Sequence, residues 1–223
     1  MKMATPSAYG KMLNPEDFVI TRRRKKYRFA KFANSSICFE FEDWKKSKAN
    51  VVEVGAGTGL FSVELARRYP EKQFVAVDVK ADRLQKGAYE AEALGLSNVR
   101  FLRARADQIA ECFTARSVEV IWLTFPDPFP KRRSAGRRLT HPTYLKIYEK
   151  LLARRGSLHL KHDSPDFFRW SLEQLVRSKW TVNELYFDLH ESDAPNDYKI
   201  QTTYEKRWLG EGRQTGFVRA IRP

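Results

Sequence analysis

Val52-Glu53-Val54-Gly55-Ala56-Gly57-Thr58-Gly59 is the stretch that decides the fold of this chain. It joins an apolar run, typical of a short buried strand, to the start of an amphipathic helix. Glycines at this junction permit a tight turn and let the backbone approach a ligand closely. The spacing is G-x-G-x-G, which differs from the G-x-G-x-x-G of dinucleotide-binding turns. Glu53 would repel a pyrophosphate and suits a cationic ligand.

Strands and helices alternate along the rest of the chain. Apolar runs predict strands at 51–54, 73–79, 99–102, 118–123 and 157–161, and two final strands at 180–189 and 215–221 that are close enough in sequence to pair antiparallel. Amphipathic patterns predict helices at 60–69, at 81–94, from Pro142 to a stop at Gly156, and from a Ser164 cap to about residue 178. This order predicts an α/β fold: a Rossmann-like, doubly wound, mostly parallel seven-stranded sheet with an antiparallel C-terminal strand.

Charge is concentrated in two segments. The net charge is +14, of which residues 1–32 carry +7 and residues 131–138 carry +5. Such clustering favours a polyanionic partner, although a basic tail that only aids solubility is the alternative for the first segment. We expect a basic N-terminal arm over residues 1–47, followed by one α/β domain over residues 48–223.

Composition excludes several other classes of protein. No apolar run has the length of a membrane span, and the first residues do not resemble a signal peptide. Cys38 and Cys112 have neither metal-site nor disulfide spacing, and the four histidines form no metal-binding pattern. We therefore expect a cytoplasmic protein without a metal or a membrane partner.

Two further acids follow predicted strands. Asp78 ends the second strand about 20 residues past the glycines, where a carboxylate can accept both ribose hydroxyls. Asp107 follows the third strand, where it can accept from an adenine amine. Each can instead cap the helix that follows it. Together with Glu53 and the glycine turn, these acids predict a pocket for S-adenosylmethionine, whose sulfonium is cationic.

A proline-rich loop follows the fourth strand, at Thr124-Phe125-Pro126-Asp127-Pro128-Phe129-Pro130-Lys131-Arg132-Arg133. Three prolines stiffen the backbone and remove three N–H donors, so Asp127 is expected on a rigid loop at the carboxyl edge of the sheet. Phe129 can stack on a base, and the cations that follow, including Arg137 and Arg138, suit phosphates. The loop indicates chemistry on nucleic acid.

Three motifs together resemble those of bacterial tRNA (guanine-N7)-methyltransferases, which are class I S-adenosylmethionine-dependent enzymes. They are F-P-D-P-F-P-K (125–131), R-R-L-T-H-P (137–142) and T-T-Y-E (202–205). The resemblance covers about residues 50–220 and implies a class I methyltransferase domain that modifies a guanosine in the tRNA variable loop. It also implies a donor site, with Asp127 as the catalytic residue, formed by Glu53, Gly55, Gly57, Gly59, Asp78, Asp107 and Asp127. The implied tRNA-binding residues are Lys131, Asp163, Thr202, Thr203, Tyr204 and Glu205.

Some alternatives stay open at this point. T-x-x-E is also a helix capping box, and Asp163 can cap a helix before Pro165. His162, which replaces the usual threonine of the family, is interpreted as a packed or hydrogen-bonded residue. Other functions are a noncatalytic RNA-binding protein on the same fold or a methyltransferase for another RNA. The protein is expected to be a monomer or a homodimer.

Overall fold

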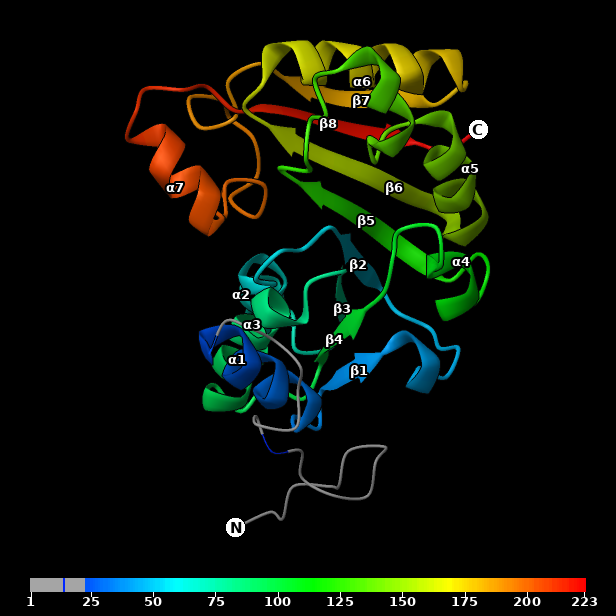
Figure 1. The fold of residues 1–223 in the computed structure, drawn as a ribbon. Helices are drawn as coiled ribbons and strands as arrows, with labels where there is room; N and C mark the ends of the chain where they lie inside the picture. Colours follow the sequence, from blue (N-terminus) through cyan, green and yellow to red (C-terminus); the bar gives the residue numbers. More distant parts are fainter. Residues whose placement is uncertain (1–13, 15–22) are drawn as a thin grey trace.

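A sheet of eight strands forms the centre of the computed structural model, which describes residue 14 and residues 23–223 (Figure 1). The spatial order is β1-β4-β3-β2-β5-β6-β8-β7. The strands are β1 (Cys38–Glu40), β2 (Val51–Val54), β3 (Phe74–Asp78), β4 (Val99–Arg103), β5 (Val118–Thr124), β6 (Leu152–His162), β7 (Thr181–Tyr186) and β8 (Gly216–Ile221). The α-helices are α1 (Arg23–Ala33), α2 (Leu60–Arg68), α3 (Ala81–Ala93), α4 (Ile109–Cys112), α5 (Pro142–Leu151), α6 (Pro165–Arg177) and α7 (Thr203–Leu209).

The pairing of the strands confirms the predicted fold class. All pairs from β1 to β6 are parallel, and β8 is antiparallel to both β6 and β7. The sheet has one strand more than expected, because β1 pairs with β4. This strand lies within the expected arm, and so does α1, which carries most of the arm's basic residues; residues 1–13 and 15–22 of the arm lie outside the described residues. The division at residue 47 stays a prediction.

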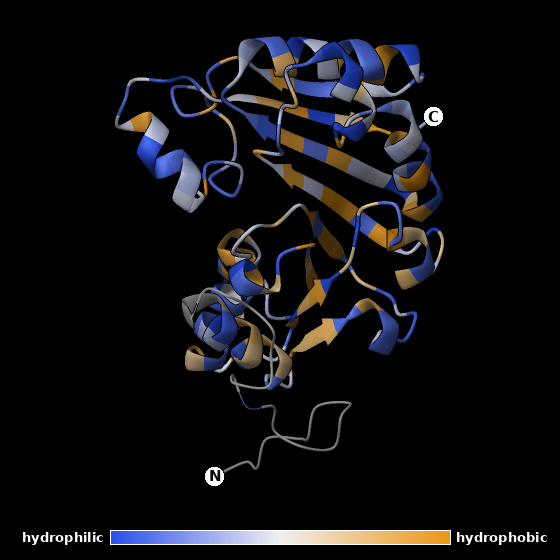
Figure 2. Cartoon of the chain, viewed as in Figure 1, coloured by the Kyte–Doolittle hydropathy of each residue, from blue (hydrophilic) through white to orange (hydrophobic). Residues whose placement is uncertain are grey.

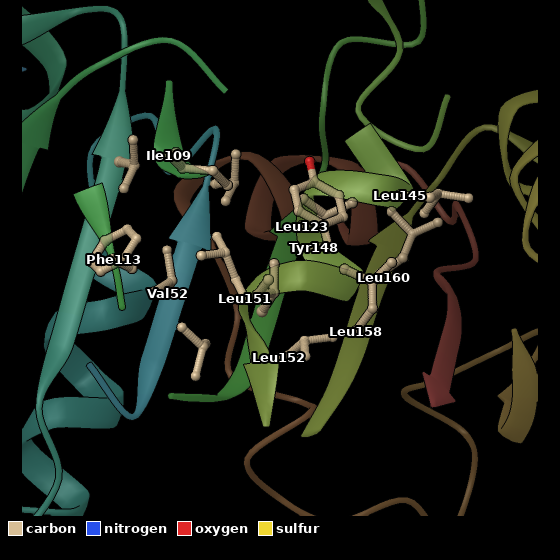
Figure 3. Close-up of a cluster of buried hydrophobic side chains, with 14 of the residues drawn as sticks. Val52, Ile109, Phe113, Leu123, Leu145, Tyr148, Leu151, Leu152, Leu158 and Leu160 are labelled. Atoms are coloured by element: carbon tan, nitrogen blue, oxygen red, sulfur yellow. The ribbon is translucent and has the colours of Figure 1, made fainter. Parts of the chain in front are cut away.

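Two apolar layers sandwich the sheet. Leu123, Leu158 and Leu160 point to the face covered by α4, α5 and α6, where Figure 3 shows them packed with Leu145 and Tyr148. The opposite face is covered by α1, α2, α3 and the segment 187–202. Figure 2 shows apolar residues gathered on the strands and hydrophilic residues frequent on α6 and α7. Burial of both faces explains why the parallel strands read as continuous apolar runs.

The predicted stop of a helix at Gly156 is wrong. α5 ends at Leu151, and Gly156 lies inside β6, where the pairing with β5 is irregular. A Cβ at Gly156 would lie 2.9 Å from the carbonyl oxygen of Val118 and 3.0 Å from that of Glu119. The glycine therefore allows two strands to approach each other closely and does not end a helix.

The helices of the described residues are all too short or too polar to cross a membrane.

Candidate functional site

The glycine turn lies at the carboxyl end of β2 and has the tight form that its sequence predicts. Gly55, Gly57 and Gly59 have φ angles of 75°, 57° and 70°, a region that other residues rarely adopt. Asp78, at the end of β3, accepts hydrogen bonds from the amides of Gly57 and Lys80, each over 2.8 Å. Burial raises the pKa of the Asp78 carboxyl. Asp78 thus fixes the turn to the neighbouring strand.

Glu53 lies beneath the turn and is almost completely buried. The hydroxyls of Ser62 on α2 and Thr124 on β5 each donate to one of its carboxylate oxygens over 2.6 Å. Burial raises the pKa of Glu53 to about 7 in spite of these hydrogen bonds. No local pattern predicts these two hydroxyl partners, because they come from different elements. Glu53 is held rigidly, with its charge set by pH near neutrality.

Gly87 is a second determinant of the turn that sequence reasoning missed. It lies in the middle of α3, and a Cβ there would come within 2.4 Å of the carbonyl oxygen of Thr58. A side chain would therefore push α3 away from the glycine turn. A lone glycine inside a helical pattern was the available signal.

Asp107 pairs with Arg105 near the surface and not with the residues of the glycine turn. It is exposed and forms an ion pair with Arg105 over 2.9 Å, which lowers the pKa of its carboxyl. The N-cap of α4 is Gln108, so Asp107 does not cap that helix. Its predicted contact with an adenine amine stays a prediction.

The proline loop follows β5 and carries Asp127 at an exposed position. Phe125 and Phe129, on either side of it, have positive φ angles of 52° and 40°, which are unfavourable for residues with side chains. Such strain persists only where surrounding contacts hold the backbone in place. The contacts come from β6 and from Arg138.

His162, the last residue of β6, holds the centre of the loop. Its Nε2 lies 2.9 Å from the carbonyl oxygen of Pro126, and the amide of Ser164 donates to Nδ1 over 2.8 Å. The ring is therefore neutral, with its proton on Nε2. Burial lowers the pKa of this ring. The interpretation of His162 as a packed, hydrogen-bonded residue is confirmed.

Arg137 and Arg138 lie in different surroundings. The guanidinium of Arg138 donates to the carbonyl oxygens of Pro128 and Phe129 over 3.0 and 3.1 Å and stacks on Trp170. Arg137 is exposed, with its guanidinium 4.4 Å from the centre of the Phe129 ring. Arg138 thus holds the loop, whereas Arg137 lies on its surface. Lys131 is also exposed, as are Arg132 and Arg133.

The T-T-Y-E segment begins α7 and forms the capping box that its pattern predicts. The amide of Glu205 donates to the Thr202 hydroxyl over 3.1 Å, and the amide of Thr202 donates to Glu205 Oε2 over 3.0 Å. Thr203 and Tyr204 are exposed, whereas Glu205 is fully buried. A direct contact of these residues with tRNA stays a prediction.

Asp163 connects β6 to the chain that follows α7. It accepts from Nη1 of Arg213 over 3.2 Å, while Ser164 provides the cap of α6. The alternative of Asp163 as that cap is therefore wrong. Arg213 also lies over the ring of Trp208, at 3.8 Å.

Lys161 is a buried cation at the same end of β6. Its Nζ donates to Glu205 Oε2 over 2.8 Å and to the carbonyl oxygen of Ile200 over 2.7 Å. His190 lies 2.8 Å from the other carboxylate oxygen of Glu205. The sequence signal for this buried ion pair is a lysine at the end of an apolar strand pattern, and the sequence analysis missed it.

The structure therefore brings Glu53, Asp78 and the glycine turn together, with the proline loop and α7 at the same edge of the sheet. A recess of about 380 Å³ lies elsewhere, near the amino ends of β3 and β4, with Phe39, Trp44, Lys48 and Arg100 in its wall. No predicted site residue lines this recess. Among residue 14 and residues 23–223, no three His, Cys, Asp or Glu side chains gather as metal ligands.

Comparisons with known proteins agree with this geometry. A family model described as "Putative methyltransferase" matches residues 47–217. A "tRNA (guanine-N(7)-)-methyltransferase" of Brevibacillus brevis is 34% identical over 182 residues, which are 80% of this chain and 85% of the relative. A protein of the same name from Porphyromonas gingivalis is 38% identical over 75% of this chain and 69% of its own length. The solved structure of the 16S rRNA methyltransferase KamB shares the fold, with a TM-score of 0.60 and 17% identity over 82% of this chain and 90% of that one.

Proposed function

Because the chain belongs to the tRNA (guanine-N7)-methyltransferase family, we propose that it transfers a methyl group from S-adenosylmethionine to N7 of a guanosine in the variable loop of tRNA. One arrangement carries this proposal. The stiff loop with Asp127 adjoins the donor-type acids at one edge of the sheet and is followed by exposed cations. We further propose that the protein is cytoplasmic, that it is a monomer or a homodimer, and that it binds tRNA at this edge of the sheet.

The residues of the glycine turn fit the methyl donor. S-adenosylmethionine supplies an electrophilic methyl group on a positively charged sulfur. Ionised Glu53 offers a complementary negative charge, although it acts from beneath the turn. Asp78 has two oxygens that already accept from Gly57 and Lys80, and each oxygen has a second lone pair for a ribose hydroxyl. Gly57 leaves open space where a side chain would stand.

The chemistry of the acceptor explains why no general base is needed. Guanine N7 carries a free lone pair at neutral pH. The new bond forms from this lone pair to the methyl carbon, the carbon–sulfur bond breaks, and its electrons stay on sulfur. The positive charge thereby moves from sulfur to the purine. Catalysis then depends on alignment and on electrostatic stabilisation of that charge.

Asp127 is our candidate for this stabilisation. It lies exposed at the tip of a loop whose backbone is held by His162 and Arg138. The guanosine must leave its stack to react, and the ring of Phe129 offers a surface for the extruded base. We assign the neighbouring phosphates to the exposed side chains of Lys131 and Arg137, which would make binding depend on salt.

A methyl-transfer assay with nucleoside analysis tests the proposal. Labelled S-adenosylmethionine is incubated with the protein and bulk tRNA that lacks modifications, and the nucleosides are then separated. We expect 7-methylguanosine. A different methylated nucleoside would overturn the assignment of guanine N7 as the acceptor, while the assignment of S-adenosylmethionine as the donor would stand. Absence of donor binding would support a noncatalytic RNA-binding protein on the same fold.

A further inference from the structure

The end of β6 contacts three segments that are distant in sequence. The carbonyl oxygen of Lys161 accepts from the amide of Phe125, where the proline loop begins. His162 binds the next residue of that loop, and Asp163 binds Arg213 after α7. The side chain of Lys161 reaches the first turn of α7 through Glu205. Three consecutive residues therefore set the positions of the proposed base-binding loop and of α7.

Within the described part of the chain, α7 has few other attachments to the body of the protein, of which the clearest is Arg213, bound to Asp163, over the ring of Trp208. It has seven residues, and Glu205 is the only one of them that is buried. A helix this short is unstable on its own, and its apolar side chains Trp208 and Leu209 are only half-buried. Figure 1 shows α7 standing apart from the helices that cover the two faces. Its position therefore depends mainly on what Glu205 binds.

Lys161 is the cation that makes burial of Glu205 possible. Both side chains are fully buried, so each charge is stable there only when paired and hydrogen-bonded. Burial lowers the pKa of Lys161, and the charges of Glu205 and, more weakly, Glu53 act in the opposite direction. Lys161 thus lies between the acid under the glycine turn and the acid under α7. It contacts neither solvent nor any exposed candidate for tRNA contact.

We propose that Lys161 is a positioning residue for tRNA binding, which holds α7 at the edge of the site through its buried ion pair with Glu205. The inference rests on the proposed function, because it assigns α7 to the tRNA surface. It adds a residue that acts from inside the protein. Loss of the Lys161 ammonium removes the buried cation that faces Glu205 and the donor of the Ile200 carbonyl oxygen, while Glu205 keeps only the Thr202 amide and His190. α7 is then no longer held in its place.

The test compares Lys161→Met with Lys179→Met, which makes the same change at an exposed lysine beyond the opposite edge of the sheet. Three quantities are measured: deuterium uptake of residues 203–209, the Kd for tRNA from filter binding, and the Kd for S-adenosylmethionine. For Lys161→Met we expect faster uptake in α7, tRNA binding weakened by about tenfold or more, and donor affinity changed less than tRNA affinity. Lys179→Met leaves all three unchanged.

Two results would overturn the proposal. One is faster uptake in α7 with unchanged tRNA affinity, since the ion pair would then be structural only. The other is an equal loss of donor and tRNA affinity. None of the three measurements needs methyl transfer, so failure of the proposed reaction in the native protein would be recognised separately.

A milder variant covers the case in which Lys161→Met does not fold. Glu205→Gln keeps an oxygen for the Thr202 amide and removes the charge that Lys161 binds. We expect it to raise uptake in α7 and to weaken tRNA binding in the same direction. If both variants fold, the double variant binds tRNA no more weakly than the worse single variant, because the two residues act as one unit. Independent, additive losses would contradict that unit.

Discussion

His162 and Pro126 join the end of β6 to the proline loop, through a hydrogen bond of 2.9 Å from the imidazole Nε2 to the carbonyl oxygen. Both residues are buried, so the carbonyl has no access to water as a substitute partner. A neutral imidazole thus provides the donor that a strained loop needs next to Asp127.

His162→Ala is expected to loosen this loop. The variant leaves the Ser164 amide and the buried Pro126 carbonyl without the imidazole, and the loss at the buried carbonyl costs about 1–3 kcal/mol. A displacement of Asp127 by about 1 Å would lower kcat by about a hundredfold. Thermal unfolding and steady-state kinetics measure the two effects. Unchanged kcat in a folded variant would show that the loop does not depend on this bond.

Asp127→Ala tests the role of the carboxylate in the transition state. We expect a fall in kcat of about a hundredfold or more, with the Kd for S-adenosylmethionine changed only slightly, because Asp127 is proposed to stabilise charge that arises on the purine. Asp127→Asn keeps the size and removes the charge. Equal losses in turnover and donor binding would contradict the proposed role.

Arg137→Ala and Arg138→Ala are expected to act differently, although they are neighbours. Arg137 lies on the surface, so its loss should reduce the salt slope of tRNA binding by about one. Arg138 binds two backbone carbonyls of the loop, so its loss should lower stability and kcat more than the slope. Titrations of each variant with tRNA at several salt concentrations give the two slopes. Equal slopes for both variants would remove the distinction.

Donor affinity is expected to depend on pH through Glu53. Burial raises the pKa of this carboxyl to about 7, so it is neutral below that pH and ionised above it. Only the ionised form attracts a sulfonium, hence affinity rises with pH through 7 and levels off above it. If only that form binds, the gain from pH 6 to pH 8 is about tenfold. Calorimetric titration of Glu53→Gln should show a flat profile.

Gly87→Ala is expected to weaken donor binding although it favours the helix. Alanine gains about 1 kcal/mol of helix propensity over glycine, but its Cβ would lie 2.4 Å from the Thr58 carbonyl oxygen. Relief of that contact displaces α3 from the glycine turn, at a cost of about 1–3 kcal/mol. Denaturant unfolding and donor titration check both effects. Gly95→Ala has open space at its Cβ but a φ of 67°, so it lowers stability without touching Thr58 and serves as the control for donor affinity.

Local sequence patterns predicted most of the fold. The glycine turn, the Ser164 cap and the T-x-x-E capping box each involve residues a few positions apart, and the structure has them as predicted. β1 was missed because three residues of an edge strand leave no periodic signal. Gly156 was misread because the strand that approaches it belongs to a distant part of the chain.

The supports of the candidate site could not be predicted in the same way. Ser62 and Thr124 meet Glu53 from two other elements, and Lys161 meets Glu205 across 44 residues. Such pairs depend on the three-dimensional arrangement, and a single sequence has no marker for them. The position of Asp107 after β4 was evident from the sequence. Its ion pair with Arg105 became visible only in the structure.

The place of β8 in the sheet has a consequence for synthesis on the ribosome. β8 follows β7 in the chain but lies between β6 and β7. β7 therefore has no partner until residues 216–221 have emerged, and during that interval the edge of β6 is open. Nascent chains that stall after β7 would expose two unpaired strand edges, which are templates for aggregation. Slow translation over the last codons of this region would lengthen that exposure.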